Sequence, residues 1–171
     1  MLIDTHAHLD GKRFDKDRED IINDLKNDDV DIVINPGADF MSSVKAVDMS
    51  KNYDNIYAAV GIHPHEAKSM DDNTINLLKD LASKGKVVAI GEIGLDYHRD
   101  YRQTAKLQHR MFKEQLQLAE ELELPVIIHC RKAYDRIIPM LRGHDLRAVI
   151  FHAYSGRPEQ LKQILEFRSY I

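Results

Sequence analysis

The sequence has little cysteine and no long apolar run. Cys130 is the single cysteine among its 171 residues, which excludes an intramolecular disulfide and is compatible with a reducing compartment. The opening MLIDTHAHLD has no basic segment followed by an apolar run, and no later stretch approaches the roughly 20 apolar residues of a membrane helix. We therefore expect a cytoplasmic protein with no membrane association, in which Cys130 is a small buried hydrophobic residue.

A surplus of positive charge is also lacking. The formal net charge is −4, whereas domains that coat nucleic acid electrostatically usually carry a basic surplus. A polyanionic substrate would therefore have to be held locally. Divalent cations in a site would serve this purpose, because they offset the carboxylates that bind them.

Several familiar catalytic motifs are missing from the sequence. It contains no GxxxxGK[ST] phosphate loop, no GxSxG elbow, no GxGxxG after the first expected strand and no CxxC pattern. These absences argue against a nucleotide-binding P-loop, a serine hydrolase of that type, a dinucleotide-binding fold and a cysteine-rich zinc site.

Short β-branched runs alternate with longer amphipathic stretches along the whole chain, with no linker or shift in composition, so we expect one domain over residues 1–171. The pattern predicts six strands and, between them, six helices. The strands are expected at Leu2–His6, Asp31–Asn35, Ile56–Ile62, Val87–Ile93, Val126–Cys130 and Ala148–His152. The helices are expected at Lys16–Asn27, Met41–Lys51, Thr74–Lys84, Gln103–Leu122, Ala133–Arg142 and Pro158–Phe167.

Strands joined by helical crossovers pair in parallel, which predicts the α/β class. Two arrangements are open, a doubly wound sheet and a closed (β/α)₈ barrel of the TIM type. The expected strands begin about 29 residues apart on average, and a seventh would begin near Ser169. A closed barrel typically needs roughly 250 residues. If the fold is that barrel, we expect about six of its eight strand–helix units in this chain.

The histidines gather at the ends of the expected strands. Nine histidines occur, and six of them lie at or just beyond the C-terminal end of a strand: His6, His8, His63, His65, His129 and His152. Chance would place one or two there. In barrels and open α/β sheets, active sites are built at this edge.

One group of candidate metal ligands begins at the first strand. His6 and His8 are two residues apart in an extended segment, so both imidazoles point the same way and can bind one ion, and Asp4 shares their face. Glu92 lies in the apolar run VVAIGEIGLD, where an unpaired buried carboxylate would be costly. A metal ion would remove that cost, whereas a salt-bridged core glutamate is the alternative.

His129 and His152 end two consecutive strands and are candidate ligands of a second ion. Cys130 should point to the opposite face from His129, which argues against it as a ligand. Arg131 is placed to bind phosphate, with a surface salt bridge as the alternative.

Other histidines suit contact with a substrate. His63 and His65 flank Pro64, which makes the segment turn-like, so we favour substrate contact over metal ligation for both. His98, Arg99 and Arg102 are further candidates for phosphate contacts, but for them we favour a solvated charged loop.

Five motifs together carry a family resemblance. IDTHAHLD, GIHPHEA, GEIGLDYHRD, PVIIHCRKA and FHAYSG resemble, in this order, the motifs of TatD-related deoxyribonucleases. The resemblance implies a (β/α)₈ barrel of the amidohydrolase type with two divalent ions. It also implies cytoplasmic nuclease activity on DNA, including 3′–5′ exonuclease activity.

The resemblance assigns the family's metal ligands to the residues of this chain that stand in the matching motifs. His6 and His8 would hold one ion, His129 and His152 the other, and Glu92 would be shared between them and take part in catalysis. One ion would activate a water molecule while both stabilise charge on the phosphoryl oxygens. The family's last ligand, an aspartate in a motif resembling ETDAP, has no counterpart here. The resemblance favours Mg²⁺, and Mn²⁺ and Zn²⁺ also suit imidazole and carboxylate ligands.

Two other functions are compatible with these residues. The same barrel and HxH motif serve amidohydrolases acting on a small cyclic amide or ester, although many of those relatives are expected to use a carbamylated lysine where this chain has Glu92. Alternatively, the chain is a catalytically impaired metal-binding or interaction fragment that self-associates through open barrel edges, because exposed parallel strands invite pairing.

Overall fold

The computed structural model describes residues 2–171, without the side chains of residues 99 and 100. Seven strands form one sheet in which every neighbouring pair is parallel and the spatial order follows the chain order. The α/β prediction is therefore confirmed. The strands are β1 (Leu2–Asp4), β2 (Val30–Pro36), β3 (Ile56–Val60), β4 (Val87–Asp96), β5 (Val126–Arg131), β6 (Val149–Phe151) and β7 (Ser169–Tyr170).

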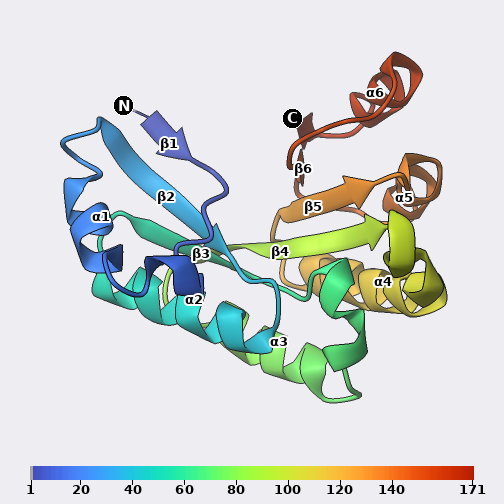
Figure 1. Ribbon diagram of the computed structural model, residues 1–171. Helices are drawn as coiled ribbons and strands as arrows, with labels where there is room; N and C mark the ends of the chain where they lie inside the picture. The colour runs from blue at the N-terminus through green and yellow to red at the C-terminus, as the bar shows by residue number, and fades with distance from the viewer. Residues whose placement is uncertain (1) are drawn as a thin grey trace.

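Helices connect the strands, and each expected helix is present. Figure 1 shows α2, α3 and α4 side by side along one face of the sheet. Three short 3₁₀ segments were not expected from the sequence, since their residues show no helical periodicity. The α-helices are α1 (Arg18–Asp24), α2 (Phe40–Asn52), α3 (Thr74–Ala82), α4 (Ala105–Glu121), α5 (Tyr134–Leu141) and α6 (Pro158–Ile164). The 3₁₀ segments are η1 (Lys12–Phe14), η2 (Pro64–Ser69) and η3 (Arg99–Thr104).

The sheet curves into an open half-barrel. A doubly wound sheet reverses its strand order at a switch point, whereas here the order runs from β1 to β7 without reversal. The two ends of the sheet, with the N-terminus at β1 and the C-terminus beyond β7, face each other across an opening (Figure 1). The TIM-barrel prediction is thus confirmed as a barrel-like arrangement of seven strands.

Apolar side chains pack on both faces of the sheet. The larger cluster lies between the sheet and its helices and contains Phe112 of α4 and Phe151 of β6, which are almost completely buried. A smaller cluster of Ala59, Ala89 and Ile127 lies in the middle strands on the concave face. Burial on both faces explains why the strands are near-continuous apolar runs.

The strand ends differ from the predicted ones where the site is built. β1 ends at Asp4, so His6 and His8 lie in the segment beyond it, and β4 continues to Asp96 with an irregular register between Ile90 and Ile93. Glu92 therefore lies within this irregular part of β4 and not at its end. Among the residues that the structure describes, no helix is long and apolar enough to cross a membrane.

Candidate metal and substrate site

Four of the six strand-end histidines converge on one cavity. Its volume is about 360 Å³, and its lining includes every residue that the sequence predicted as a metal ligand, together with Arg131. The lining residues are His6, His8, Glu92, His129, Cys130, Arg131, His152, Ala153 and Ser155. Strands β1, β4, β5 and β6 thus deliver their polar residues to the same edge of the sheet, as parallel strands must when they run in one direction.

His6, His8 and Glu92 form the first compact group of ligands. The Nε2 atoms of the two histidines are 3.1 Å apart, and they lie 3.3 Å (His6) and 3.6 Å (His8) from Oε2 of Glu92. Ligand atoms bound to one ion at about 2.0–2.2 Å are separated from each other by roughly 3 Å or slightly more. The three atoms therefore fit around a single divalent cation without large movements.

The Glu92 carboxylate faces histidines on both sides. Its Oε1 atom lies 3.2 Å from Nδ1 of His129, and its side chain is 5% exposed. Burial by itself would raise the pKa of this carboxyl, but hydrogen bonds from His129, His6 and His8 lower it. Glu92 is thus held as an anion in a buried position, with one oxygen turned to each half of the site.

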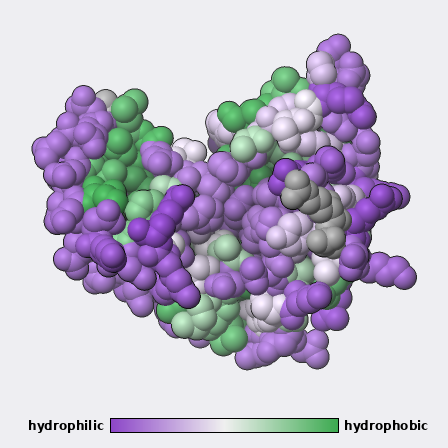
Figure 2. Space-filling view, viewed as in Figure 1, coloured by the Kyte–Doolittle hydropathy of each residue, from purple (hydrophilic) through white to green (hydrophobic). Residues whose placement is uncertain are grey.

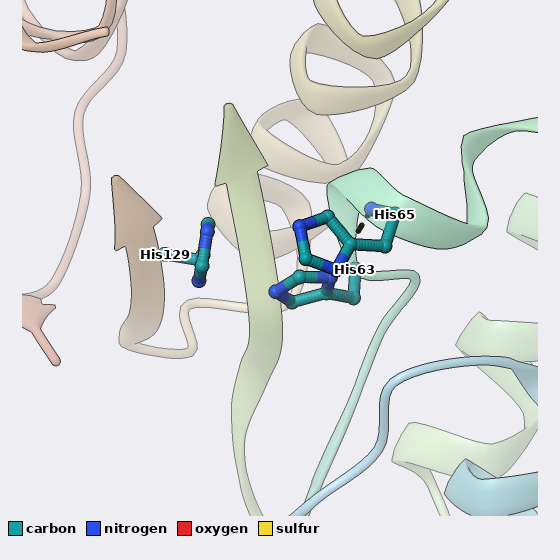
Figure 3. A group of neighbouring side chains, drawn as sticks. All are labelled: His63, His65 and His129. Carbon is teal, nitrogen blue, oxygen red and sulfur yellow. Dashed lines mark hydrogen bonds between the residues drawn. The ribbon is translucent and has the colours of Figure 1, made fainter. Parts of the chain in front are cut away.

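His63, His65 and His129 form a second compact group. Each offers a ring nitrogen to a common region, and the His129 ring lies across β4 from the other two (Figure 3). The ring centroids of His63 and His129 are 4.2 Å apart. Burial, followed by the neighbouring His129, lowers the pKa of His63 to about 3, so His63 is a neutral imidazole at pH 7. Whether His63 and His65 contact a substrate stays a prediction.

Asp96 is the main polar residue of the site that sequence reasoning missed. Its Oδ2 atom lies 2.7 Å from Nε2 of His65 and 3.0 Å from Nε2 of His129, and its side chain is completely buried. Glu92 and Asp96 are four residues apart in β4, so both face the same side of the strand. The two-residue period would have indicated Asp96 if the strand had been extended beyond Ile93.

The main chain around Asp96 is fixed by a buried glutamine of α4. The backbone N–H of Asp96 donates to Oε1 of Gln108 (2.9 Å), and Nε2 of Gln108 donates to the Asp96 carbonyl (3.0 Å). Oδ1 of Asp96 accepts from the backbone N–H of His98 (2.8 Å). Asp96 is therefore rigidly placed, and it orients His129 so that Nδ1 points toward Glu92.

His152 lines the cavity but stands outside both compact groups. Its ring stacks on that of His6, with centroids 3.5 Å apart and an interplanar angle of 7°. Burial, and then the charge of His6, lowers the pKa of His152. Its role as a ligand of the second ion remains a prediction.

The remaining candidates have clear positions. Cys130 is buried in the larger core cluster, and burial raises the pKa of its thiol to about 12, consistent with the expected hydrophobic role. Arg131 is exposed at the cavity. A Cβ atom on Gly91 would lie 2.6 Å from Cβ of Ile127, so only glycine permits this close approach of β4 to β5 beside the site.

Comparisons with known proteins agree with this architecture of histidines on a half-barrel of parallel strands. The family model described as TatD related DNase matches residues 3–171. The chain belongs to this family of metal-dependent hydrolases.

The relatives include characterised and uncharacterised proteins. A sequence from Bacillus subtilis, named as an uncharacterized metal-dependent hydrolase, YabD, is 38% identical over 100% of this chain and 68% of its own length. The 3′-5′ ssDNA/RNA exonuclease TatD of Cronobacter sakazakii is 32% identical over 96% of this chain and 63% of its own length. The chain thus spans about two thirds of the length of these relatives.

Solved structures show the same fold. The crystal structure of YJJV, a TatD homologue from Escherichia coli K12, superposes with a TM-score of 0.91 at 32% identity, covering 98% of this chain and 66% of that one. A TatD-family hydrolase from Entamoeba histolytica matches with a TM-score of 0.80 at 23% identity, covering 96% and 62%, and supports the fold alone.

Proposed function

We propose that residues 1–171 form one hydrolase domain carrying the metal centre of a phosphodiesterase that acts on DNA. The observation that carries this proposal is the convergence of His6, His8 and Glu92, with the second Glu92 oxygen facing His129. Support also comes from TatD relatives named as 3′-5′ ssDNA/RNA exonucleases. A 3′–5′ exonuclease on single strands is the corresponding specific activity.

Two divalent ions, Mg²⁺ in the first instance, fit the ligands present. His6, His8 and Glu92, whose ligand atoms lie together, would hold one ion. Glu92, His129 and His152, which line the same cavity, would hold the other. Mn²⁺ and Zn²⁺ suit the same imidazole and carboxylate atoms. When bound, such ions lower the pKa of a coordinated water and polarise phosphoryl oxygens.

Other residues of the chain act beside the ions. Arg131 binds the phosphate at the cavity rim, and His63, which is neutral, and His65 contact the substrate. Asp96 positions His129 by accepting a hydrogen bond from its Nε2 atom, the usual arrangement in which a carboxylate fixes the far ring nitrogen of a metal-binding histidine. Glu92 takes part in catalysis by linking the two halves of the site.

The test is hydrolysis of a fluorescent single-stranded oligodeoxynucleotide with added Mg²⁺ or Mn²⁺. A chelator, Glu92→Ala and His129→Ala are each expected to abolish cleavage, while His144→Ala, which removes a histidine paired with Glu120 away from the cavity, leaves it unchanged. Activity that persists in the chelator would overturn the proposal. Cleavage of a cyclic amide or ester in place of DNA would indicate the amidohydrolase alternative.

We also propose that the chain self-associates through the edges of its open sheet. β1 and β7 each have one strand neighbour among residues 2–171, and their side chains are accessible: Ile3 is 47% and Tyr170 57% exposed. Exposed apolar edges of parallel strands are templates for pairing with another chain. The occupant is a second copy of this chain.

A further inference from the structure

The cavity lined by His6, His8, His129 and His152 is called the histidine site below. A second cavity lies beside it and shares none of its lining residues. Its volume is about 600 Å³, and it is bounded by the loop after β4, the end of η3 with the start of α4, and the segment from β5 into α5. The lining residues are Tyr97, Arg102, Ala105, Lys106, His109, Lys132, Ala133, Asp135 and Arg136.

Positive charge is concentrated in this cavity although the whole chain carries a net charge of −4. Four of the lining side chains are exposed cations, and none of them forms an ion pair with any side chain that the structure describes, a set that excludes residues 99 and 100. They are Arg102, Lys106, Lys132 and Arg136. The one acidic lining residue, Asp135, is bound by Arg157 (3.3 Å) and Gln160 (2.7 Å) of the neighbouring helix start. The cavity therefore contains more cationic than anionic side chains, which favours the binding of an anion.

One wall of the cavity is aromatic. The rings of Tyr97 and His109 lie nearly parallel, with centroids 6.3 Å apart and an interplanar angle of 9°. Burial, and then the charge of Arg136, lowers the pKa of His109, so its ring is an uncharged surface at neutral pH. Nucleic-acid bases stack on such rings regardless of sequence.

The start of α4 adds to the positive potential. Ala105 and Lys106, the first two residues of this 17-residue helix, line the cavity, and its first turn contains no acidic residue. The partial positive charge of a helix N-terminus favours a nearby anion. This feature reinforces the four cations and would not define a site without them.

The cavity begins where the histidine site ends. Tyr97 directly follows Asp96, and its backbone N–H donates to the carbonyl of Arg131 (2.9 Å). Lys132 directly follows Arg131, which lines the histidine cavity. At the end of β5, two consecutive residues therefore line the two cavities.

We propose that this basic cavity binds a nucleotide of the single-stranded nucleic-acid substrate away from the bond that is cleaved. The four cations bind its phosphate, and the Tyr97–His109 wall supports its base. The proposal rests on the proposed function, because it assumes that the substrate is a nucleic-acid strand. A flexible single strand fits better than a stiff duplex, whose bases are already stacked on each other.

The experiment measures binding without catalysis. Fluorescein-labelled dT10 and U10 are titrated with the full chain in EDTA, and fluorescence anisotropy gives the dissociation constant at several salt concentrations. The test variant is Lys106→Ala/Arg136→Ala. The control is Lys45→Ala/Lys113→Ala, which removes two other exposed lysines, one on α2 and one farther along α4.

We expect the test variant to bind both oligonucleotides roughly tenfold more weakly, since charge-assisted contacts to phosphate are lost. The slope of log affinity against log salt should fall by about 0.7 for each phosphate contact removed. The control should bind like the unmodified chain. Failure of the unmodified chain to bind, or equal weakening in test and control variants, would overturn the proposal. If the double variant does not fold, the single variant Lys106→Glu is measured, and unchanged binding by it would likewise overturn the proposal.

A small substrate separates this proposal from the function of the histidine site. Bis(4-nitrophenyl) phosphate with Mn²⁺ fills only the metal centre, so its hydrolysis should be equal in the unmodified chain and the test variant. A parallel loss of this hydrolysis in the test variant would contradict a separate subsite. If neither the unmodified chain nor the test variant hydrolyses this substrate but oligonucleotide binding behaves as expected, the proposed phosphodiesterase function is wrong. The binding of nucleic acid in the basic cavity is then still supported.

Discussion

At the scale of single residues, two carboxylates on one face of β4 organise the site. Glu92 faces His6, His8 and His129, and Asp96 faces His129 and His65. His129 lies between them, with Nδ1 toward Glu92 and Nε2 toward Asp96. Burial by itself would lower the pKa of His129, but the two carboxylates raise it. The ring of His129 is thereby fixed in its rotation.

Replacing Asp96 by asparagine tests this positioning role. Asp96→Asn keeps the size of the side chain but removes the anionic acceptor, so His129 becomes less basic and less firmly oriented. We expect divalent-ion affinity, measured by calorimetry with Mn²⁺, to fall by about 10–100-fold. Asp80→Asn, at an exposed position of α3, should leave it unchanged. Equal affinities for the two variants would contradict the role.

The structure brings the histidines and Glu92 that the sequence proposes as ligands to one cavity, but the sequence did not predict their partner Asp96. Imidazoles at strand ends stand out because a polar residue following an apolar run has few structural reasons to be there. Asp96 was missed because the predicted strand ends at Ile93, whereas β4 continues to Asp96. The stacking of His152 on His6 depends on the curvature of the sheet, which no local pattern encodes.

At the scale of elements, α4 supports the site through two buried glutamines. Gln108 and Gln115 are seven residues apart, about two helical turns, so they lie on the same side of the helix. Gln115 accepts from the backbone N–H of Ile62 (2.7 Å) and donates to its carbonyl (3.1 Å), as Gln108 does at Asp96. The helix thus fixes the chain just before His63 and at Asp96.

Truncating one of these glutamines should destabilise the whole domain. Gln115→Ala would leave the buried N–H and C=O of Ile62 without side-chain partners, and each unsatisfied group costs about 1–3 kcal/mol. We expect the free energy of unfolding in urea to fall by roughly 2–4 kcal/mol. Gln117→Ala, an exposed position on the same helix, should change it by less than about 0.5 kcal/mol. A loss of similar size in both variants would show that Gln115 is not a support.

The elements themselves were predictable and their ends were less so. Apolar periodicity located all six expected strands and helices, because buried faces require it. The 3₁₀ segments η2 and η3 depend on local turns such as the hydrogen bond from the backbone N–H of His65 to Nδ1 of His63 (3.1 Å). Such a bond requires a particular side-chain orientation that the sequence does not specify.

At the scale of the whole molecule, the open half-barrel leaves apolar surface accessible. An apolar cavity of about 500 Å³ lies on the concave face, and its lining includes Ile34, Ile127, Ile150 and Tyr170. Figure 2 shows a hollow between two raised parts of the molecule, with hydrophobic surface on both sides of it. The cavity also touches His6 and His152, so the apolar interior and the proposed metal centre adjoin each other.

The open edges of the sheet predict that the chain self-associates. Pairing of β1 or β7 with a second copy would satisfy edge N–H and C=O groups and cover apolar side chains. Light scattering coupled to size exclusion should therefore show an average mass above 19.7 kDa that rises with protein concentration.

The variant Ile3→Lys/Tyr170→Lys places a charge on each edge and should shift the population toward the monomer, as charged residues do on natural edge strands. The control is Met41→Lys, which changes a side chain that is 62% exposed on helix α2 and does not belong to an edge strand. It should associate like the unmodified chain, since its hydrophobic side chain makes no contribution to strand pairing. A mass of 19.7 kDa at every concentration would exclude pairing of the edges and leave the apolar cavity open to solvent.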